Sequence, residues 1–310
     1  MRSTQVSYIL SHLCIVRLFL SLTPSLSNTC FYFINNKQKQ KYKYKRISKL
    51  TTLDLSKNNI TILNPKISNL KVLKSLNVDN NKLTPGSIGD DTLISLTKLK
   101  TLSLNNNQLG RPNNNSNNGG GAGGGGGKTN NNTHSNKSKS YDALPTTLPK
   151  SLKTLLLSNN SLSNIPRCIL GCSGSVVVQL KSLEKLDLSS NNLATVPETI
   201  SNLPSLNELN LDNNVIVSLP SAIGKLSKLK VLSVRNNHIT GKIPNSPQPL
   251  PKELWVDTLL IDMNLHGNPM TSTELNAMDG FDTFLKRRRD VKNKDILGGA
   301  MTDLSVCGLK

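Results

Sequence analysis

The chain has 310 residues, of which 36% are hydrophobic and only 4% are aromatic. This length suits two average domains or one extended domain, and the shortage of large rings means that another apolar residue must fill the core. The five Cys are too few and too scattered for a disulfide scaffold, and the four unclustered His argue against a metal site built from His ligands. No uncharged apolar run reaches the roughly 18 residues of a membrane span.

The net charge of +19 is unevenly distributed along the chain. Residues 1–50 hold nine Lys or Arg and no acid, and residues 110–150 carry a net +4. These two segments therefore supply 13 of the 19 net positive charges, and the remaining sequence is nearly balanced. The high isoelectric point thus does not predict that the folded part of the chain binds nucleic acid.

Residues 1–49 form a basic arm for which three interpretations stay open. Two apolar stretches, 6–10 and 13–22, are interrupted by polar and charged residues, and a Lys-rich run follows at 37–46. The arm is a weak secretory signal, a presequence for an organelle, or a stretch appended to the natural protein. We expect it to be disordered or to act as a targeting segment.

Residues 50–270 repeat a pattern that has an apolar residue, mostly Leu, at positions 1, 4, 6 and 11 and Asn at position 9. Eight copies keep all five positions in register. The copies begin at Leu50, Leu73, Leu99, Leu152, Leu183, Leu206, Leu229 and Leu260. A period in this range is the signature of a solenoid, so each copy is one structural unit that stacks on its neighbours.

Within each copy, positions 4 and 6 point to the same side of a short strand, because side chains alternate along a strand. We expect the strands of successive copies to stack in parallel into a curved sheet. The Asn at position 9 follows the strand, where its side chain can bond backbone groups that burial would otherwise leave unpaired. The eight Asn are therefore expected to form a ladder that serves only the fold.

The segments that return from one strand to the next indicate a subtype. Residues 193–206 read LATVPETISNLPSL, and residues 216–229 read IVSLPSAIGKLSKL. This pattern resembles the leucine-rich repeat family, in the short 23-residue form found in intracellular signalling scaffolds. The resemblance implies an α/β solenoid of about eight repeats, with a curved parallel β-sheet on its concave face and a helical C-terminal cap.

Residues 113–140 interrupt the array and consist mostly of Asn, Gly, Ser and Lys. Such a composition cannot bury enough apolar area to fold, so we expect a disordered insert. Residues 122–129 read AGGGGGKT, but no strand or helix pattern flanks them, which disfavours a phosphate-binding loop. Cys168 and Cys172 lack a second pair of ligands, which disfavours a metal or redox site.

Residues 271–297 are expected to cap the open end of the last repeat, as solenoids require, and residues 298–310 to form a tail. Apolar residues at helical spacing can cover that repeat. They are Leu275, Met278, Phe281, Phe284 and Leu285. The basic run 286–289 is expected to close the helix, where cations suit the dipole. This C-terminal sequence is similar to that of a small intracellular member of the family.

The strand positions that flank the two core residues predict the composition of the concave face. They hold six acids, only two bases, Lys185 and Arg235, and otherwise mainly small polar residues. The acids are Asp54, Asp79, Asp187, Glu208, Asp212 and Asp262. These acids and Arg235 are the candidate contacts for a protein partner with a basic docking surface.

The same face holds one His and no Ser/His/Asp or Cys/His set, so we expect no catalysis, cofactor or metal. We expect a monomeric scaffold for protein–protein interactions in cytoplasmic signal transduction, with partners such as a small GTPase or a phosphatase. The alternative is a secreted or membrane-tethered recognition protein, or an organelle-targeted one. A processed signal in residues 1–27 and a glycan at the sequon of Asn59 would indicate secretion.

Overall fold

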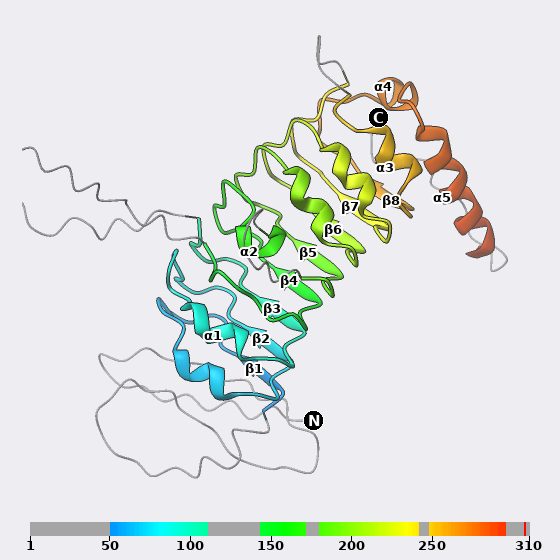
Figure 1. Cartoon of the computed structure of the whole chain (residues 1–310). Coiled ribbons are helices and arrows are strands. Elements are labelled where there is room, and N and C mark those ends of the chain that lie inside the picture. The colour runs from blue at the N-terminus through cyan, green and yellow to red at the C-terminus, as the bar shows by residue number, and fades with distance from the viewer. Residues whose placement is uncertain (1–49, 111–142, 172–179, 242–247, 296–306, 308–310) are drawn as a thin grey trace, which may run out of the picture.

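Eight short parallel strands in a single sheet organise the structure. The computed structural model describes residues 50–110, 143–171, 180–241, 248–295 and 307. The strands are β1 (Thr52–Asp54), β2 (Ser75–Asn77), β3 (Thr101–Ser103), β4 (Thr154–Leu156), β5 (Lys185–Asp187), β6 (Glu208–Asn210), β7 (Val231–Ser233) and β8 (Asp262–Asn264). Figure 1 shows them stacked in chain order, with short helices in a second layer behind the sheet.

The register of the sheet follows the sequence repeat. The residue at position 4 of each repeat pairs with its equivalent in the next, from Leu53 opposite Leu76 to Leu232 opposite Met263. β3 and β4 are neighbours although the segment 113–140 separates them in the sequence. The expected α/β solenoid with a parallel sheet is therefore confirmed.

Short helices connect the strands and lie behind the sheet. The 3₁₀ helices are η2 (Pro65–Asn69), η4 (Glu198–Asn202) and η5 (Ser221–Lys225), and the α-helices are α1 (Asp90–Ile94), α2 (Arg167–Leu170) and α3 (Lys252–Val256). Pro197, Pro220 and Pro251 cap η4, η5 and α3 in extended conformation, because the ring holds φ near its preferred value. Ile200 and Ile223 point inward from η4 and η5 and complete a core that is otherwise mostly Leu.

The Asn at position 9 satisfies backbone groups of two repeats. Asn81 donates from Nδ2 to the carbonyl oxygens of Val78 and Leu55, at 2.9 and 3.0 Å, and Leu55 belongs to the preceding repeat. Its Oδ1 accepts the N–H of Ile60 at 3.0 Å. The same pattern recurs at Asn107, Asn160, Asn191, Asn214, Asn237 and Asn268. The expected ladder is present and ties each repeat to the one before.

Two further helices, α4 (Ser272–Asn276) and α5 (Phe281–Asp295), close the C-terminal end. Phe281 and Phe284 of α5 are buried against Trp255 of α3, with ring centroids 5.0 and 5.6 Å from the indole. The helical cap is therefore confirmed. Trp255, the only Trp of the chain, lies before the cap segment in the sequence, and helical spacing within residues 271–297 does not reveal its part in the cap.

The basic run 286–289 does not close the helix, contrary to the expectation, because α5 continues to Asp295. Arg287 turns toward the last repeat instead. Its guanidinium donates to the carbonyl oxygens of Trp255 and Leu260, at 3.0 and 2.9 Å, and partial burial lowers its pKa. Part of this basic run therefore attaches the cap to the solenoid.

Cys307 lies against the last strand, although the sequence assigns it to a tail. Its carbonyl oxygen accepts the N–H of Leu265 at 2.8 Å, just as the carbonyl of Asn264 accepts the N–H of Val234 one repeat earlier. Cys307 thus occupies the place that a ninth strand would take. Its side chain is buried, which removes the thiol from water.

Because of the Cys307 thiol, we expect the free energy of unfolding to vary with pH in the alkaline range. Burial raises its pKa from an ordinary value of 9.0 to about 12, so the thiol stays protonated in the folded protein while it ionises in the unfolded chain. Its contribution should be complete below pH 9 and fall as the pH rises toward 12. The difference in unfolding free energy between wild type and Cys307→Ala, measured by urea denaturation at pH 8, 10 and 11, should shrink with pH. A constant difference would contradict the burial of the thiol.

Several expectations fall on residues outside those that the structure describes. They are the basic arm 1–49, the insert 113–140 and Cys172 of the Cys168–Cys172 pair. These expectations, and the domain boundaries drawn from the sequence, stay predictions. In the described ranges, none of the helices combines the length and apolar character that crossing a bilayer requires.

Candidate functional site

The concave face is built from the side chains at positions 3, 5 and 7 of each repeat. Most of them are half-buried because they stand beside their equivalents on adjacent strands, while Arg235, Asp262 and His266 are exposed. The face brings Lys185 and Glu208 together as an ion pair between β5 and β6. It places Arg235 next to Asp212, whose Oδ1 accepts the Arg235 backbone N–H.

The backbone leaves each strand through a tight turn with an N–H that needs an acceptor. In five repeats, the Asp or Asn at position 5 accepts this N–H from the residue two positions later, at 2.8–3.0 Å. The acceptors are Asp54, Asn77, Asp187, Asn210 and Asn264. Either residue type serves, because both carry a short side chain that ends in an acceptor oxygen.

The other three repeats have no Asp or Asn at position 5, and the preceding repeat supplies the acceptor. In β3 this position is Ser103. Asp79 reaches across from the second repeat, and its Oδ1 accepts both the N–H of Asn105 and the hydroxyl of Ser103 at 2.7 Å. The carboxylate of Asp79 therefore holds the turn of its neighbour.

In two more places, a side chain at position 7 supplies the acceptor for the turn of the next repeat. Asp212 Oδ1 accepts the N–H of Arg235 at 2.7 Å and the hydroxyl of Ser233 at 2.6 Å. Asn105 Oδ1 accepts the N–H of Ser158 at 2.8 Å, next to a repeat that has Leu156 at position 5. Asp or Asn at position 7 thus occurs in the three repeats whose successor lacks its own acceptor.

These contacts separate the six acids predicted for the face into structural, ion-paired and unpaired groups. Asp79 and Asp212 have a structural role, because each connects two repeats. Glu208 is paired with Lys185. Asp54, Asp187 and Asp262 are left with no Lys or Arg ion pair among the described residues, which makes them the strongest candidates for contact with a partner.

Removal of the Asp212 carboxylate should therefore cost stability. Asp212→Ala strips the acceptor from the Ser233 hydroxyl and the Arg235 N–H, and hydrogen bonds to charged groups contribute about 1.5–3 kcal/mol when well shielded. We expect a loss of about 1–3 kcal/mol in urea denaturation for this half-buried site. Asp187→Asn keeps its own acceptor oxygen and should stay within about 0.5 kcal/mol of wild type. Equal effects of the two changes would rule out the structural role of Asp212.

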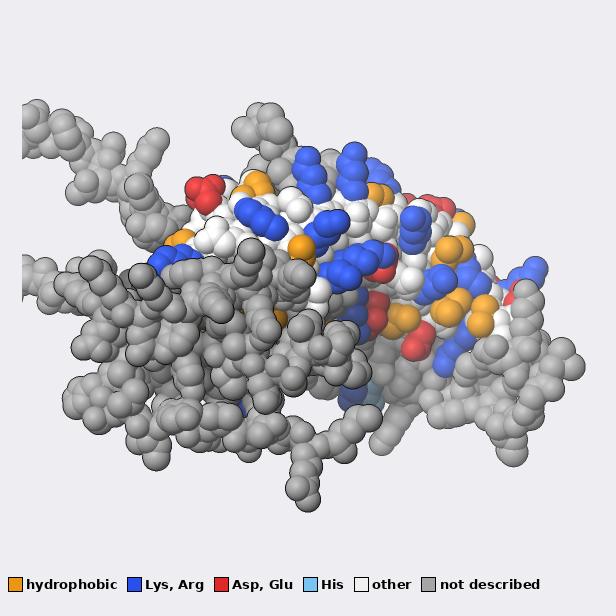
Figure 2. Space-filling model, turned by 90° about the horizontal axis from the view of Figure 1, so that it is seen from below, with side chains coloured by type: hydrophobic (Ala, Val, Ile, Leu, Met, Phe, Trp, Pro, Cys, Tyr) orange, Lys and Arg blue, Asp and Glu red, His pale blue; other side chains and the backbone are white. Residues whose placement is uncertain are grey.

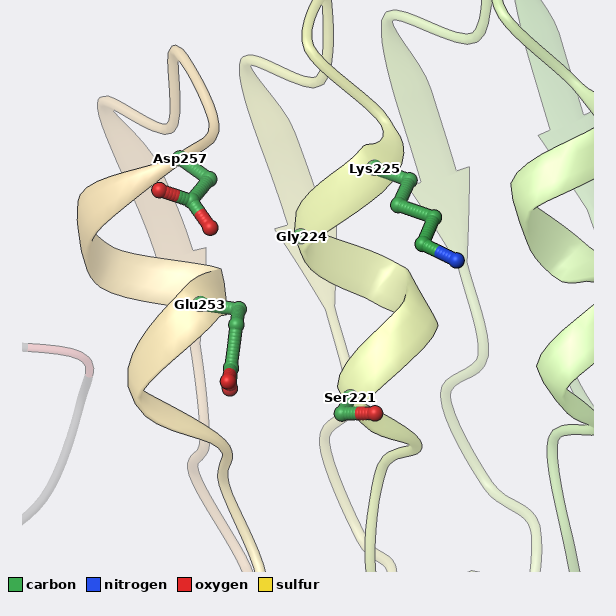
Figure 3. A pocket seen from close by; sticks show the side chains of 5 residues that line it. All are labelled: Ser221, Gly224, Lys225, Glu253 and Asp257. Atoms are coloured by element: carbon green, nitrogen blue, oxygen red, sulfur yellow. The ribbon is translucent and has the colours of Figure 1, made fainter.

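On the opposite side of the sheet, a shallow pocket lies between η5 and α3. Ser221, Gly224, Lys225, Glu253 and Asp257 line it. Figure 3 shows Lys225 pointing away from the two carboxylates, and no ion pair joins them among the described residues. Lys225 and the two carboxylates therefore do not form a charge cluster in the pocket. Among all residues that the structure describes, no cluster of three His, Cys, Asp or Glu could hold a metal.

Family comparisons agree with the repeat pattern and with the geometry of the sheet. A leucine rich repeat model matches residues 150–216, and a second leucine rich repeat model matches residues 49–70 and 228–250. The matched segments contain β1, β4, β5, β6 and β7, which share one sheet and one register. The described part of the chain has the fold of a leucine-rich repeat solenoid.

The solenoid is similar to Podocan-like protein 1 of Mus musculus, with 30% identity over 169 residues, and of Homo sapiens, with 31% identity over 168 residues. Each alignment covers 48% of this chain but 24% and 27% of the relatives, so the chain spans about a quarter of the curated relatives it matches. Leucine-rich repeat proteins generally mediate protein–protein interactions through extended concave surfaces.

Two solved structures are also similar. A leucine-rich repeat protein of Leptospira interrogans has 26% identity and a TM-score of 0.49, with 74% of this chain and 52% of that chain covered. Internalin C2 of Listeria monocytogenes has 21% identity and a TM-score of 0.49, with 75% and 79% covered.

Proposed function

We propose that this leucine-rich repeat solenoid is a non-enzymatic scaffold whose acidic concave face binds a basic surface of a partner protein. The observation that carries the proposal is the position of Asp54, Asp187 and Asp262 on the face without Lys or Arg partners among the described residues. Small polar side chains make up most of the rest of the face, so a partner can approach the sheet closely. Complementary charge then directs encounter and selects the partner.

We further propose that the scaffold acts in the cytoplasm, in signal transduction, and binds a partner such as a small GTPase or a phosphatase. The support is the short 23-residue repeat and a resemblance at both ends of the array to leucine-rich repeat-containing protein 57, a small intracellular member of the family. The first repeat, LTTLDLSKNNI, and the Gly-Phe-Asp-Thr-Phe stretch at the start of α5 carry this resemblance.

The test is affinity capture from the native cell with matched charge variants of the whole chain. The face variant combines Asp54→Asn, Asp187→Asn and Asp262→Asn. Asn already occupies position 5 in β2, β6 and β8, so the fold tolerates it at Asp54 and Asp187, while Asp262, at position 3, is exposed. The control variant combines Asp91→Asn, Asp257→Asn and Asp282→Asn, which remove the same charge from exposed sites elsewhere.

A partner that the wild type and the control retain, and that the face variant loses, supports the proposal. A partner that all three retain equally contradicts it. The alternative, a secreted or membrane-tethered recognition protein, is favoured by the signal-like apolar stretches within residues 1–27. N-terminal sequencing and mass spectrometry of the native protein decide between the two locations, because secretion predicts removal of that segment and a glycan at Asn59.

A further inference from the structure

The lysines of the solenoid gather along one edge of the sheet, where the chain enters each strand. In repeats two to seven, we consider the four residues that run from two before the first Leu to one after it. These six short segments contain nine Lys and a single acid, Glu184. The lysines are Lys71, Lys74, Lys98, Lys100, Lys150, Lys153, Lys181, Lys228 and Lys230, and we call this set the lysine edge. In the view of Figure 2, Lys and Arg side chains gather across the described surface with fewer acids between them.

The backbone places three of these lysines in direct succession. The N–H of Lys100 donates to the carbonyl of Lys74, and the N–H of Lys153 donates to the carbonyl of Lys100, both at 2.8 Å. Neighbouring strands are about 4.8 Å apart, so three ammonium groups follow one another along the axis of the solenoid. Like charges on directly opposed strand positions destabilise a sheet.

Little in the described part of the chain relieves this repulsion. Lys153 pairs with Glu184 at 2.5 Å, whereas no other lysine of the edge has a carboxylate partner among the described residues. All except Lys153 are exposed. The edge is thus a row of solvated positive charges that a linear polyanion laid along the axis would neutralise.

We propose that the lysine edge is a second docking surface, which binds an acidic segment of a partner protein. It is separate from the concave face, whose own charge is opposite, and does not depend on it. Lys presents a compact point charge that attracts carboxylates in any orientation, and the edge contains no Arg, whose planar fork would fix the orientation of the anion.

Other polyanions fit the edge less well. Single-stranded nucleic acid uses aromatic side chains as stacking platforms, but the aromatic residues that the structure describes, Trp255, Phe281 and Phe284, are buried in the cap. Amphipathic surfaces that bind membranes add buried apolar side chains to the electrostatic attraction of their lysines. None of the exposed large hydrophobic residues of the described chain lies in the six segments.

The test uses the full chain and a fluorescein-labelled 12-residue peptide of alternating Glu and Ser, with binding followed by fluorescence anisotropy at 0.05 M salt. The edge variant combines Lys98→Glu and Lys100→Glu. The control combines Lys66→Glu and Lys82→Glu, two exposed lysines outside the edge. Since both variants change the net charge equally and both retain the basic arm, a difference between them reports the edge.

We expect the edge variant to weaken peptide binding by about tenfold relative to the control. Lys100→Glu alone should weaken binding while its melting temperature equals or exceeds that of wild type, because a carboxylate between Lys74 and Lys153 relieves their repulsion. This second result separates lost binding from lost folding.

Equal binding by the edge variant and the control would overturn the proposal, since the attraction would then follow net charge. Absence of peptide binding by the wild type would overturn it as well. So would tighter binding of a 12-nucleotide oligothymidylate, or of vesicles that contain phosphatidylserine, than of the peptide.

Discussion

Replacement of Phe284 by Ala should lower the free energy of unfolding by about 3–5 kcal/mol, the range typical of a buried Phe. The ring is fully buried and packs on both Phe281 and Trp255, at centroid distances of 5.5 and 5.6 Å. These three rings seal the open end of the eighth repeat. Because repeats contact only their neighbours, an unsealed end should unravel inward from the cap.

Hydrogen exchange is the measurement that localises this loss. Amides of β7 and β8 should exchange faster in Phe284→Ala, while those of β2 and β3 should keep their protection. Val291→Ala, on the same helix but partly exposed, is the control and should have little effect. If β7 and β8 stay protected in Phe284→Ala, α5 does not act as a cap.

Replacement of Asn191 by Ala should cost about 3–5 kcal/mol, because two buried N–H groups lose their acceptor at about 1–3 kcal/mol each and three carbonyls lose a donor. Asn191 Oδ1 accepts the N–H groups of Asn160 and Leu162, each at 3.0 Å. Its Nδ2 donates to the carbonyl oxygens of Leu157, Leu188 and Ser189. One side chain thus satisfies five backbone groups in two repeats.

The measurement combines urea denaturation with hydrogen exchange of single amides. The Asn160 and Leu162 amides should lose protection first in Asn191→Ala, since they lose their acceptor directly. Asn192→Ala changes the adjacent exposed side chain and should stay close to wild type. Unchanged exchange at Asn160 and Leu162 would contradict the ladder as the connection between repeats four and five.

The solenoid and its ladder are predictable from the sequence because each depends on residues that recur at fixed positions. Asn191 and its equivalents occupy the same place in every repeat, so one physical argument covers them all. Trp255 and Cys307 lie outside the positions that recur in every repeat. They pack through tertiary contacts that no periodicity indicates. Their roles therefore emerge only from the structure.

The role of Asp79 and Asp212 has a signal in the sequence, although a count of charges on the face does not detect it. Each precedes a repeat whose position 5 is Ser, Ser103 or Ser233, and Asn105 precedes the repeat with Leu156. A comparison of position 7 in one repeat with position 5 in the next would reveal the exchange. The sum of charges over a face treats structural and solvated carboxylates alike.

The charges counted along the sequence do not indicate the lysine edge, for a related reason. Residues 51–109 hold seven bases and four acids, and residues 151–270 hold ten bases and eight acids, so the sums over these segments hide the separation of acids and bases in space. In the structure, lysines occupy the strand entrances and acids occupy positions 3, 5 and 7 of the concave face. Two surfaces of opposite charge thus lie on one solenoid.

The association rate of the captured partner, measured at two ionic strengths, tests the acidic face most directly. The comparison is between wild type and the variant that combines Asp54→Asn, Asp187→Asn and Asp262→Asn. At 0.01 M salt, where the Debye length is about 30 Å, the variant should associate about tenfold more slowly. At 0.15 M salt the difference should shrink, because screening weakens electrostatic steering. Equal rates for the two proteins at both salt concentrations would contradict the concave face as the binding site.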